Sequence, residues 1–367
     1  MKILHMTTLH PPEDLRILGK ECRTLAGQGY DVQLAARVPS ETAIDGIAVV
    51  PIGPLEVRAG VTKLARRLLS AWRAARRARA SLYHLHDPEL IPVGLLLKLR
   101  GKRVTYDAHE DTPLDLQSLG DVARRARLAA RPYKAANWLA GRFFDAIVAA
   151  TPGVASSFPA KKTIVARNFP LTAEAEAFVG PPHRERPEEV IYIGRISEDR
   201  GVREMTEAAR MAGATVVLAG PAHEPLLSAL HEGEQWPWVD YRGRLSRQEI
   251  ATALQRARAG LVVLHPRKAY LESLPVKLFE YMAAGIPVIA SDFPLWRQIV
   301  AGAGCGLLVD PADPDAIASA IESVLADPDA AEEMGRRGRE AVRETYNWDT
   351  ESKQLLDLYA RLSRDRA

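Results

Sequence analysis

Two glutamates, Glu272 and Glu280, flank a predicted helix start in the segment ESLPVKLFEYMAAGIPVIAS. We expect the helix to run from Pro275 to Gly285, because proline suits a first helical position and glycine commonly follows the last one. Leu274 would then be the N-cap, and its side chain cannot accept a hydrogen bond from the first N–H groups of the helix. These N–H groups, at the positive end of the helix dipole, are therefore open to an anion.

Two arginines form a second group of candidate anion ligands in the segment IYIGRISEDRG. Arg195 directly follows an apolar run, and Arg200 comes five residues later. Two guanidinium groups near one strand end can hold two adjacent phosphates through bidentate hydrogen bonds. Together with the open helix N-terminus they suggest a diphosphate site. The alternative is that Glu198 and Asp199 neutralise the arginines in ordinary surface ion pairs.

Glu280 also has two interpretations. A carboxylate a short distance beyond a phosphate site can accept hydrogen bonds from a ribose diol, as acidic residues do beside dinucleotides. Alternatively, Glu280 forms a surface ion pair with Lys277, three residues earlier on the helix, worth about 0.3 kcal/mol. In either case we expect a solvent-facing helix position, where a substitution changes the unfolding free energy by less than about 0.5 kcal/mol.

The elements that must position these residues alternate between short apolar runs and helical patterns. In the first half the runs are KILHMTT, DVQLAAR, SLYHLHD, KRVTYDAHE and FFDAIVAAT, with a helix expected over about Asp14–Ala26. In the second half they are EVIYIGR, ATVVLAG, VDYRGR, AGLVVLHP and IPVIAS. Strands alternating with helices are typical of α/β proteins with doubly wound parallel sheets.

The sequence also predicts where one domain ends and the next begins. Residues 168–189, NFPLTAEAEAFVGPPHRERPEE, are rich in Pro, Glu and Ala and have no apolar period, so we expect a linker there. The first domain would then span residues 1–167 and the second residues 190–348. We expect a C-terminal helix over about residues 349–367 to pack back on the first domain.

In doubly wound sheets, ligands bind beyond the carboxyl ends of the strands. The residues that follow predicted strands there include His10, His86, His109, Arg195, Gly220, Arg244 and the loop that contains Glu272. Several of these are titratable or basic, which is typical of a binding or catalytic site. Backbone groups around Gly243 and Arg244 are candidates for contacting a nucleotide base.

Composition narrows the class of partner. Residues 1–180 hold 26 Lys and Arg against 17 Asp and Glu, whereas residues 181–367 hold 23 against 29. The basic half contains no zinc-finger spacing, RNP-like aromatic motif or helix-turn-helix signature, so an anionic lipid or a phosphorylated substrate is favoured over nucleic acid. Since the sequence has no run of 18 apolar residues and no secretory h-region, we expect a cytoplasmic protein. Cys22 and Cys305 match no metal-binding spacing and are expected to be reduced structural thiols.

At this point the sequence resembles a known family. Glu272 and Glu280 form an E-x7-E motif, GRISEDRG is similar to the GR-xxxx-KG signature, and EYMAAGIPVIAS resembles the helix and strand of glycosyltransferase family 4. The resemblance extends from HPPEDLR to YNWDTESKQLLDLY. It implies the GT-B fold, with two Rossmann-like doubly wound domains facing a central cleft. It also implies a retaining transfer from a nucleotide-diphosphate sugar without a metal ion or other cofactor.

The resemblance also assigns roles to individual residues. It implies that Arg195 and Arg200 hold the diphosphate and that Glu280 holds the ribose. Glu272 would contact hydroxyls of the donor sugar, while Ser273 and Leu274 lie beside the donor at the helix N-terminus. His109, in YDAHED, matches the active-site histidine of the family; the alternative is a histidine that only caps a strand end. In the family's usual account, the acceptor hydroxyl attacks from the front face and the departing phosphate oxygen helps to remove its proton.

The chain departs from the family pattern in two places. Arg200 stands where the family usually has lysine, which keeps the charge but changes the geometry. The first loop, TLHPPEDLRIL, contains no glycine, whereas many members have a pair of glycines there. His10, Asp14 or Arg16 are the candidates to replace that glycine pair, and His86 is a further candidate on the acceptor side.

Two Asp-Pro-Asp segments, at Asp313 and at Asp327, resemble the metal-binding DxD motif of the other major transferase fold. Each Asp-Pro pair comes just before an alanine-rich helix, where Asp at the N-cap and Pro at N1 are expected. We therefore predict helix caps and no metal site at these positions.

Residues 57–80, VRAGVTKLARRLLSAWRAARRARA, carry eight basic residues and no acidic one. We expect an apolar stripe along this helix, formed by Val61, Leu64, Leu68, Leu69 and Trp72. One interpretation is a domain helix whose stripe packs on the sheet and whose basic face is solvated. The other is a basic face that lies against an anionic membrane or gathers a lipid-diphosphate acceptor.

The leading hypothesis is an enzyme, peripheral at the inner face of the cell membrane, that glycosylates a cell-surface glycan or a lipid-linked precursor. The alternatives are a transferase acting on a soluble small molecule or sugar, and a nucleotide-sugar-binding pseudoenzyme. The presence of Arg195, Glu272, Glu280 and His109 argues against the pseudoenzyme, whereas the glycine-free first loop argues slightly for it.

Overall fold

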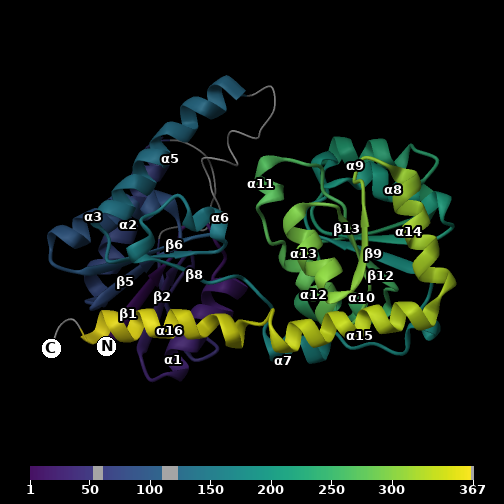
Figure 1. Cartoon of the computed structure of the whole chain (residues 1–367). Coiled ribbons are helices and arrows are strands. Elements are labelled where there is room, and N and C mark those ends of the chain that lie inside the picture. The colour runs from purple at the N-terminus through teal and green to yellow at the C-terminus, as the bar shows by residue number, and fades with distance from the viewer. Residues whose placement is uncertain (53–60, 110–122, 365–367) are drawn as a thin grey trace. The chain divides into compact units, whose positions relative to one another are not determined.

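The chain forms two compact units (Figure 1), and the computed structural model describes residues 1–52, 61–109 and 123–364. Unit 1 consists of Met1–Asn168 and Glu351–Ala367, and unit 2 consists of Phe169–Thr350. The last helix, α16 (Trp348–Arg364), therefore lies mostly in unit 1.

Unit 1 is built on an eight-stranded sheet in the order β3-β4-β2-β1-β5-β6-β7-β8. All neighbouring strands are parallel except the edge pair β3 and β4, which is antiparallel. The strands are β1 (Lys2–Met6), β2 (Asp31–Ala36), β3 (Thr42–Ile44), β4 (Ile47–Pro51), β5 (Leu82–Leu85), β6 (Arg103–Ala108), β7 (Ala146–Ala149) and β8 (Thr163–Val165).

The helices of unit 1 connect these strands. They are a π-helix, η1 (Leu15–Cys22), followed by α1 (Arg23–Gly27), α2 (Val61–Ala78), α3 (Ile91–Leu99), α5 (Ala123–Phe143) and α6 (Pro152–Ala155). The helix predicted over Asp14–Ala26 is confirmed, but its first part is wider than an α-helix, because the N–H of Gly19 bonds to the carbonyl of Asp14. Asp14 is the N-cap, accepting a hydrogen bond from the N–H of Ile17.

Helix α2 packs on the sheet through alanines rather than through the predicted leucine stripe. Ala71 and Ala75 are fully buried, whereas Leu64 is 40% exposed and Leu69 is 47% exposed. Leu69 lies two residues from Ala71, about 200° around the helix, so it faces away from the sheet. The predicted stripe is therefore wrong at Leu64 and Leu69. Residues 57–60 and the side chains of Val61 and Lys63 lie outside the described residues.

Unit 2 contains a six-stranded parallel sheet in the order β11-β10-β9-β12-β13-β14. Its strands are β9 (Glu189–Ile193), β10 (Thr215–Ala219), β11 (Val239–Gly243), β12 (Ala259–Val262), β13 (Val288–Ser291) and β14 (Gly306–Val309). The chain builds outward from β9 in one direction and then returns to build from β12 in the other. The predicted α/β architecture with doubly wound sheets is thus confirmed.

The α-helices of unit 2 connect these strands and flank the sheet. They are α7 (Thr172–Ala177), α8 (Val202–Met211), α9 (Glu224–His231), α10 (Arg247–Arg256), α11 (Lys268–Leu271), α12 (Val276–Ala284), α13 (Pro294–Ala303), α14 (Pro314–Ala326) and α15 (Pro328–Glu344). Asp313 and Asp327 accept hydrogen bonds from N–H groups of the first turns of α14 and α15, so the predicted capping roles are confirmed.

Residues 168–189, predicted as a linker, contribute to the core of unit 2. Phe169, Ala175 and Phe178 are buried in the same apolar cluster as Phe279 of α12. Cys22 and Cys305 are both buried free thiols, as predicted. Among the described helices, none combines the length and the apolar composition needed to cross a bilayer.

Candidate functional site

The strand order of unit 2 reverses between β9 and β12, and the predicted diphosphate ligands lie where these two strands end. The chain leaves β9 through Gly194 and Arg195 and then forms a short 3₁₀ turn over Glu198–Arg200. The crevice outside the carboxyl ends of parallel strands at such a reversal is the usual ligand site of doubly wound sheets. Arg195 is exposed there, and its carbonyl accepts a hydrogen bond of 2.9 Å from the hydroxyl of Tyr192.

Gly194 leaves room for two cations to approach the backbone. Its φ of 135° lies in a region that favours glycine. A Cβ atom placed on Gly194 would lie 2.8 Å from Nζ of Lys277 and 3.6 Å from Nη1 of Arg200. Lys277 and Arg200 therefore converge on the same residue at the end of β9.

Lys277 is the functional candidate that the sequence analysis missed. Lys277 is 8% exposed, and its amine lacks a hydrogen-bond partner among the described residues. Nζ lies 3.6 Å from the ring centroid of Tyr192, a cation–π contact. Burial lowers the pKa of Lys277 well below its usual value, the charge of Arg200 lowers it further, and Glu280 opposes the shift. A bound anion would supply the missing partner.

Neither Glu198 nor Asp199, the carboxylates considered as partners of the two arginines, pairs with Arg200. Glu198 instead pairs with Arg203 at 2.8 Å, and Asp199 lies 3.6 Å from Arg267. Asp199 also accepts a hydrogen bond of 2.5 Å from the hydroxyl of Tyr270. Burial disfavours the charge of Arg200, but Tyr192 and Tyr270 outweigh it and raise the pKa of the guanidinium. Arg200 is therefore a charged donor at the end of β9.

Helix α12 begins one residue later than predicted. Its N-cap is Pro275 rather than Leu274, and no side chain within the described residues caps it. The predicted end is confirmed, because Gly285 has a φ of 65° at the C-cap. The loop before α12 is held by Trp296, whose Nε1–H donates a 2.8 Å hydrogen bond to the carbonyl of Ser273. The uncapped helix N-terminus thus has a fixed position.

The two glutamates of the E-x7-E motif lie in different environments. Glu272 is exposed in the loop between α11 and α12, as predicted. Glu280 is only 5% exposed, so the prediction of a solvent-facing position is wrong. The physical reason is that α12 is buried from Lys277 to Ala284 and packs against α15.

Glu280 also has a different ion-pair partner from the one predicted. Its Oε1 accepts a hydrogen bond of 2.6 Å from Nη1 of Arg247, the first residue of α10. Arg247 in turn donates to Glu174 at 3.0 Å. Gly243 is the last residue of β11, and the exposed Arg244 follows it in the short loop before α10. The predicted base-contact loop therefore leads directly to Arg247, the partner of Glu280.

In unit 1 the strand order reverses between β1 and β5, and several predicted residues meet there. Nδ1 of His10 lies 3.3 Å from Asp14, and the rings of His10 and His109 are 4.7 Å apart. Burial opposes the charge of His10, but the hydrogen bond to Asp14 and nearby carboxylates outweigh it and raise the pKa of His10. Burial raises the pKa of Asp14, but the hydrogen bonds from His10 and from the N–H of Ile17 outweigh this effect and lower the pKa to about 2.

Asp107 organises the residues behind His109. It accepts hydrogen bonds from Arg16 of 2.9 and 2.7 Å, and its Oδ2 lies 2.8 Å from Nε2 of His109 and 3.1 Å from Nδ1 of His86. Burial favours neutral Asp107, but Arg16 and His109 outweigh it and keep its pKa well below the usual value. The sequence analysis did not single out Asp107, although a charged residue inside the apolar run RVTYDA was a signal for it.

Arg16 and His86 are therefore structural neighbours of the site rather than exposed loop groups. Arg16 is 3% exposed, and besides Asp107 it donates a 2.8 Å hydrogen bond to the carbonyl of Ala166. His86 is buried 3.2 Å from His109. Of the first-loop candidates, His10 and Asp14 lie beside His109, whereas the guanidinium of Arg16 is bound to Asp107 in the interior.

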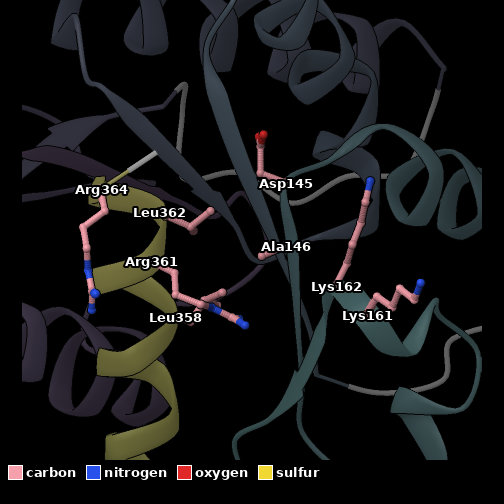
Figure 2. A pocket seen from close by; sticks show the side chains of 8 residues that line it. All are labelled: Asp145, Ala146, Lys161, Lys162, Leu358, Arg361, Leu362 and Arg364. Atoms are coloured by element: carbon pink, nitrogen blue, oxygen red, sulfur yellow. The ribbon is translucent and has the colours of Figure 1, made fainter. Parts of the chain in front are cut away.

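A pocket in unit 1 lies at the opposite edge of the sheet, near the amino ends of β7 and β8. Figure 2 shows Lys161 and Lys162 on one side of it and Arg361 and Arg364 of α16 on the other. Lys162 already donates hydrogen bonds of 2.9 and 3.2 Å to two backbone carbonyls. None of the predicted site residues lines this pocket.

Comparison with known proteins places this geometry in a family. The family models "Glycosyltransferase Family 4" and "Glycosyl transferases group 1" match residues 18–165 and 174–341. Glycogen synthase of Mycobacterium tuberculosis is 25% identical over 220 residues, covering 58% of this chain and 50% of that protein. A GDP-mannose-dependent phosphatidylinositol monomannoside mannosyltransferase of the same species is 30% identical, covering 47% of each chain. The chain thus spans about half the length of the curated relatives it matches.

Solved structures show the same fold over nearly the whole chain. Sucrose-phosphate synthase from Thermosynechococcus elongatus has a TM-score of 0.77 at 22% identity, covering 98% of both chains. Anabaena HepE in complex with UDP-glucose has a TM-score of 0.71 at 15% identity, covering 99% of both chains. The predicted GT-B fold is therefore confirmed. Since the two family models together match most of both units, the chain belongs to glycosyltransferase family 4.

Proposed function

We propose that the protein transfers a hexosyl group, with retention, from a nucleotide-diphosphate sugar to an acceptor hydroxyl. The observation that carries this proposal is the cation pair at the end of β9, where the buried amine of Lys277 and the guanidinium of Arg200 converge on Gly194. A buried amine without a hydrogen-bond partner is costly, and a bound diphosphate would supply that partner and favour the protonated form of the amine. HepE, a structural neighbour, was solved in complex with UDP-glucose.

In this proposal unit 2 binds the donor. Arg195, Arg200 and Lys277 hold the diphosphate, together with the first N–H groups of α12 beside Ser273 and Leu274. Glu280, positioned by Arg247, accepts hydrogen bonds from the ribose with its second oxygen. Glu272 contacts the transferred sugar, and the loop of Gly243 and Arg244 contacts the base.

The leaving diphosphate gains charge as the glycosidic bond breaks, and the cations stabilise that charge. Because Arg200, Lys277 and the dipole of α12 already supply positive charge, we propose that no divalent cation takes part in the transfer. His109, hydrogen-bonded to Asp107, is the proposed active-site histidine of unit 1.

Unit 1 is the proposed acceptor domain, and a lipid-linked or cell-surface glycan is the preferred acceptor. Helix α2 exposes arginines next to apolar side chains, including Leu64 and Leu69. Near an anionic bilayer each such arginine contributes about 1 kcal/mol before screening. The mannosyltransferase named above acts, by its name, on a phosphatidylinositol glycolipid. We therefore propose peripheral attachment through α2, at the cytoplasmic face of the membrane.

Co-sedimentation with phosphatidylglycerol vesicles at low and high salt tests this attachment. Arg67 is partly buried and pairs with Glu89 at 3.3 Å, so the variant should leave it in place. The charge-removal variant replaces four exposed arginines of α2 with Gln, at Arg66, Arg73, Arg76 and Arg77. A control variant removes four charges from unit 2, at Arg210, Arg256, Arg336 and Arg343. Equal binding by both variants, or no binding by wild type, favours a soluble acceptor.

A thermal-shift screen with UDP, GDP, ADP and dTDP sugars tests the donor proposal directly. We expect one nucleotide sugar to raise the unfolding temperature, and the same donor to be hydrolysed slowly without an acceptor. Binding without hydrolysis would favour the pseudoenzyme, and no binding of any nucleotide sugar would refute the proposal.

A further inference from the structure

Four ligand-type side chains gather in the interior of unit 1, below the residues assigned to the active site. His5 comes from β1, His84 from β5, and Glu21 from the π-helix η1, while His86 directly follows β5. His5 is paired with His84 in the parallel register of these strands, and His86 lies two residues further along the same face. Each of the four residues is at most 2% exposed.

These side chains lie close enough to share one ion. One ligand atom of each lies within 4.8 Å of the ligand atoms of the other three. Nδ1 of His5 and Nε2 of His86 are already 2.9 Å apart, and the rings of His84 and His86 stack with centroids 4.7 Å apart. A tetrahedral zinc site has bonds of about 2.0–2.1 Å and ligand atoms about 3.3 Å apart, so the side chains would have to draw together when the ion binds.

The polar atoms of the cluster are incompletely satisfied without an ion. Nε2 of His5 and Nε2 of His84 are buried without a hydrogen-bond partner among the described residues, whereas the carboxyl group of Glu21 faces Asp107. Arg16 lies 3.4 Å from Glu21, but its guanidinium already forms the bidentate pair with Asp107. Buried polar atoms without partners are rare, and an absent ion is one explanation for a group of them.

The outer nitrogens of two histidines already have the partners that a metal ligand requires. Nδ1 of His86 lies 3.1 Å from Asp107, and Nδ1 of His84 lies 2.6 Å from the hydroxyl of Tyr359 on α16. If each Nδ1 carries the proton and donates to that oxygen, each Nε2 keeps a free lone pair. Nε2 of His86 then faces Nδ1 of His5 at 2.9 Å, whereas His84 lies nearest to Glu21 through its Nδ1, at 3.8 Å. Histidine ligands of zinc are oriented by such outer hydrogen bonds in the same way.

We propose that His5, Glu21, His84 and His86 bind a zinc ion in the interior of unit 1. Three imidazole nitrogens and one carboxylate oxygen would fill all four positions, and a site without an open position holds the fold rather than activating a water molecule. The site belongs to unit 1, whereas the proposed diphosphate residues belong to unit 2, and the zinc proposal does not depend on the proposed transferase activity. Its role is to hold β1, β5 and η1 together behind His109.

The test measures metal content in the full chain, produced without a histidine tag in zinc-supplemented medium. We expect about one zinc ion per chain by mass spectrometry in the wild type, and less than about a tenth of that in Glu21→Gln and His84→Gln. His183→Gln is the matched control, because His183 is a buried histidine of unit 2 that hydrogen-bonds to the carbonyl of Arg258. It should keep its zinc.

A second measurement does not depend on the variants folding. Wild type unfolded in urea with a chelator and refolded with Zn²⁺ should melt at a higher temperature than protein refolded without it. Refolding with Co²⁺ should give the visible absorption bands of a tetrahedral nitrogen and oxygen site. Zinc-free wild type whose melting temperature does not respond to zinc would overturn the proposal, and so would zinc retained at wild-type level by both ligand variants.

Discussion

Replacing Lys277 with methionine distinguishes two roles for this residue, binding a ligand and stabilising the fold. Methionine is apolar and similar in length, and the position is almost completely buried beside Tyr192. Leaving a polar group buried without a partner costs about 1–3 kcal/mol, while the cation–π contact returns up to about 2 kcal/mol. We therefore expect Lys277→Met to unfold with a free energy within about 1 kcal/mol of wild type, or higher.

Nucleotide binding should respond in the opposite direction. A hydrogen bond from a charged donor to a phosphate contributes about 1.5–3 kcal/mol, so its loss should raise the dissociation constant roughly 10- to 150-fold. Urea unfolding and calorimetric titration with UDP, or with the nucleotide selected by the screen, measure the two quantities on the same samples. Inorganic pyrophosphate should show the same loss, because the lysine contacts the diphosphate.

Arg210→Met is the control for this experiment. Arg210 lies on α8 of the same unit and pairs with Glu207 at 2.6 Å on the surface, so both quantities should stay near their wild-type values. A Lys277→Met variant that loses stability while binding nucleotide as wild type does would show that the lysine is structural. The diphosphate assignment would then be wrong.

Three further predictions concern the carboxylates and the charge of the site. Glu280→Gln should lower the unfolding free energy by about 1–3 kcal/mol, because Glu280 is buried against Arg247. In calorimetry the same variant should weaken UDP binding but not pyrophosphate binding. Equal effects on both ligands would contradict the ribose role. Transfer by folded protein should survive brief EDTA treatment in a product assay, and a loss that manganese restores would overturn the metal-free assignment. Folding raises the pKa of His10 and lowers the pKa of Asp14, so their ion pair stabilises the fold where both groups are charged, from about pH 4 to 6.5. Above that range the stabilisation is lost as His10 deprotonates. Urea unfolding should therefore show Asp14→Asn costing about 0.5 kcal/mol more at pH 5.5 than at pH 8.5, and no difference would refute the pair.

The apolar runs were sufficient to predict ten of the strands, because a buried parallel strand needs a continuous apolar stretch. Four strands escaped prediction. β3 and β8 have only three residues each, and β3 is an edge strand with two exposed positions. β4 and β14 are short apolar runs, IAVVP and GLLV, that were not singled out although they carry the signal. The helix caps at Asp313 and Asp327 were predicted correctly, because capping depends only on neighbouring residues.

The parts of the site that were wrong or missed depend on contacts between distant residues. Glu280 is paired with Arg247, which precedes it by 33 positions on another helix, so helical spacing alone pointed to Lys277. Lys277 itself looked like a surface group until the packing of α12 showed that its amine is buried beside Gly194. Asp107, Glu21 and His84 acquire their meaning only when β1, β5, β6 and η1 come together.

Unit 1 is interrupted by unit 2, and this has a consequence for biosynthesis. The N–H of Trp348 bonds to the carbonyl of Pro170 at 2.8 Å, so the two ends of unit 2 are held together like those of an inserted domain. A ribosome must synthesise the whole of unit 2 before α16 can supply Tyr359 to His84. Until then the side of unit 1 that α16 covers, including His84, stays uncovered on the nascent chain. Unit 2 has no such delay, so it should fold first although it begins later in the sequence.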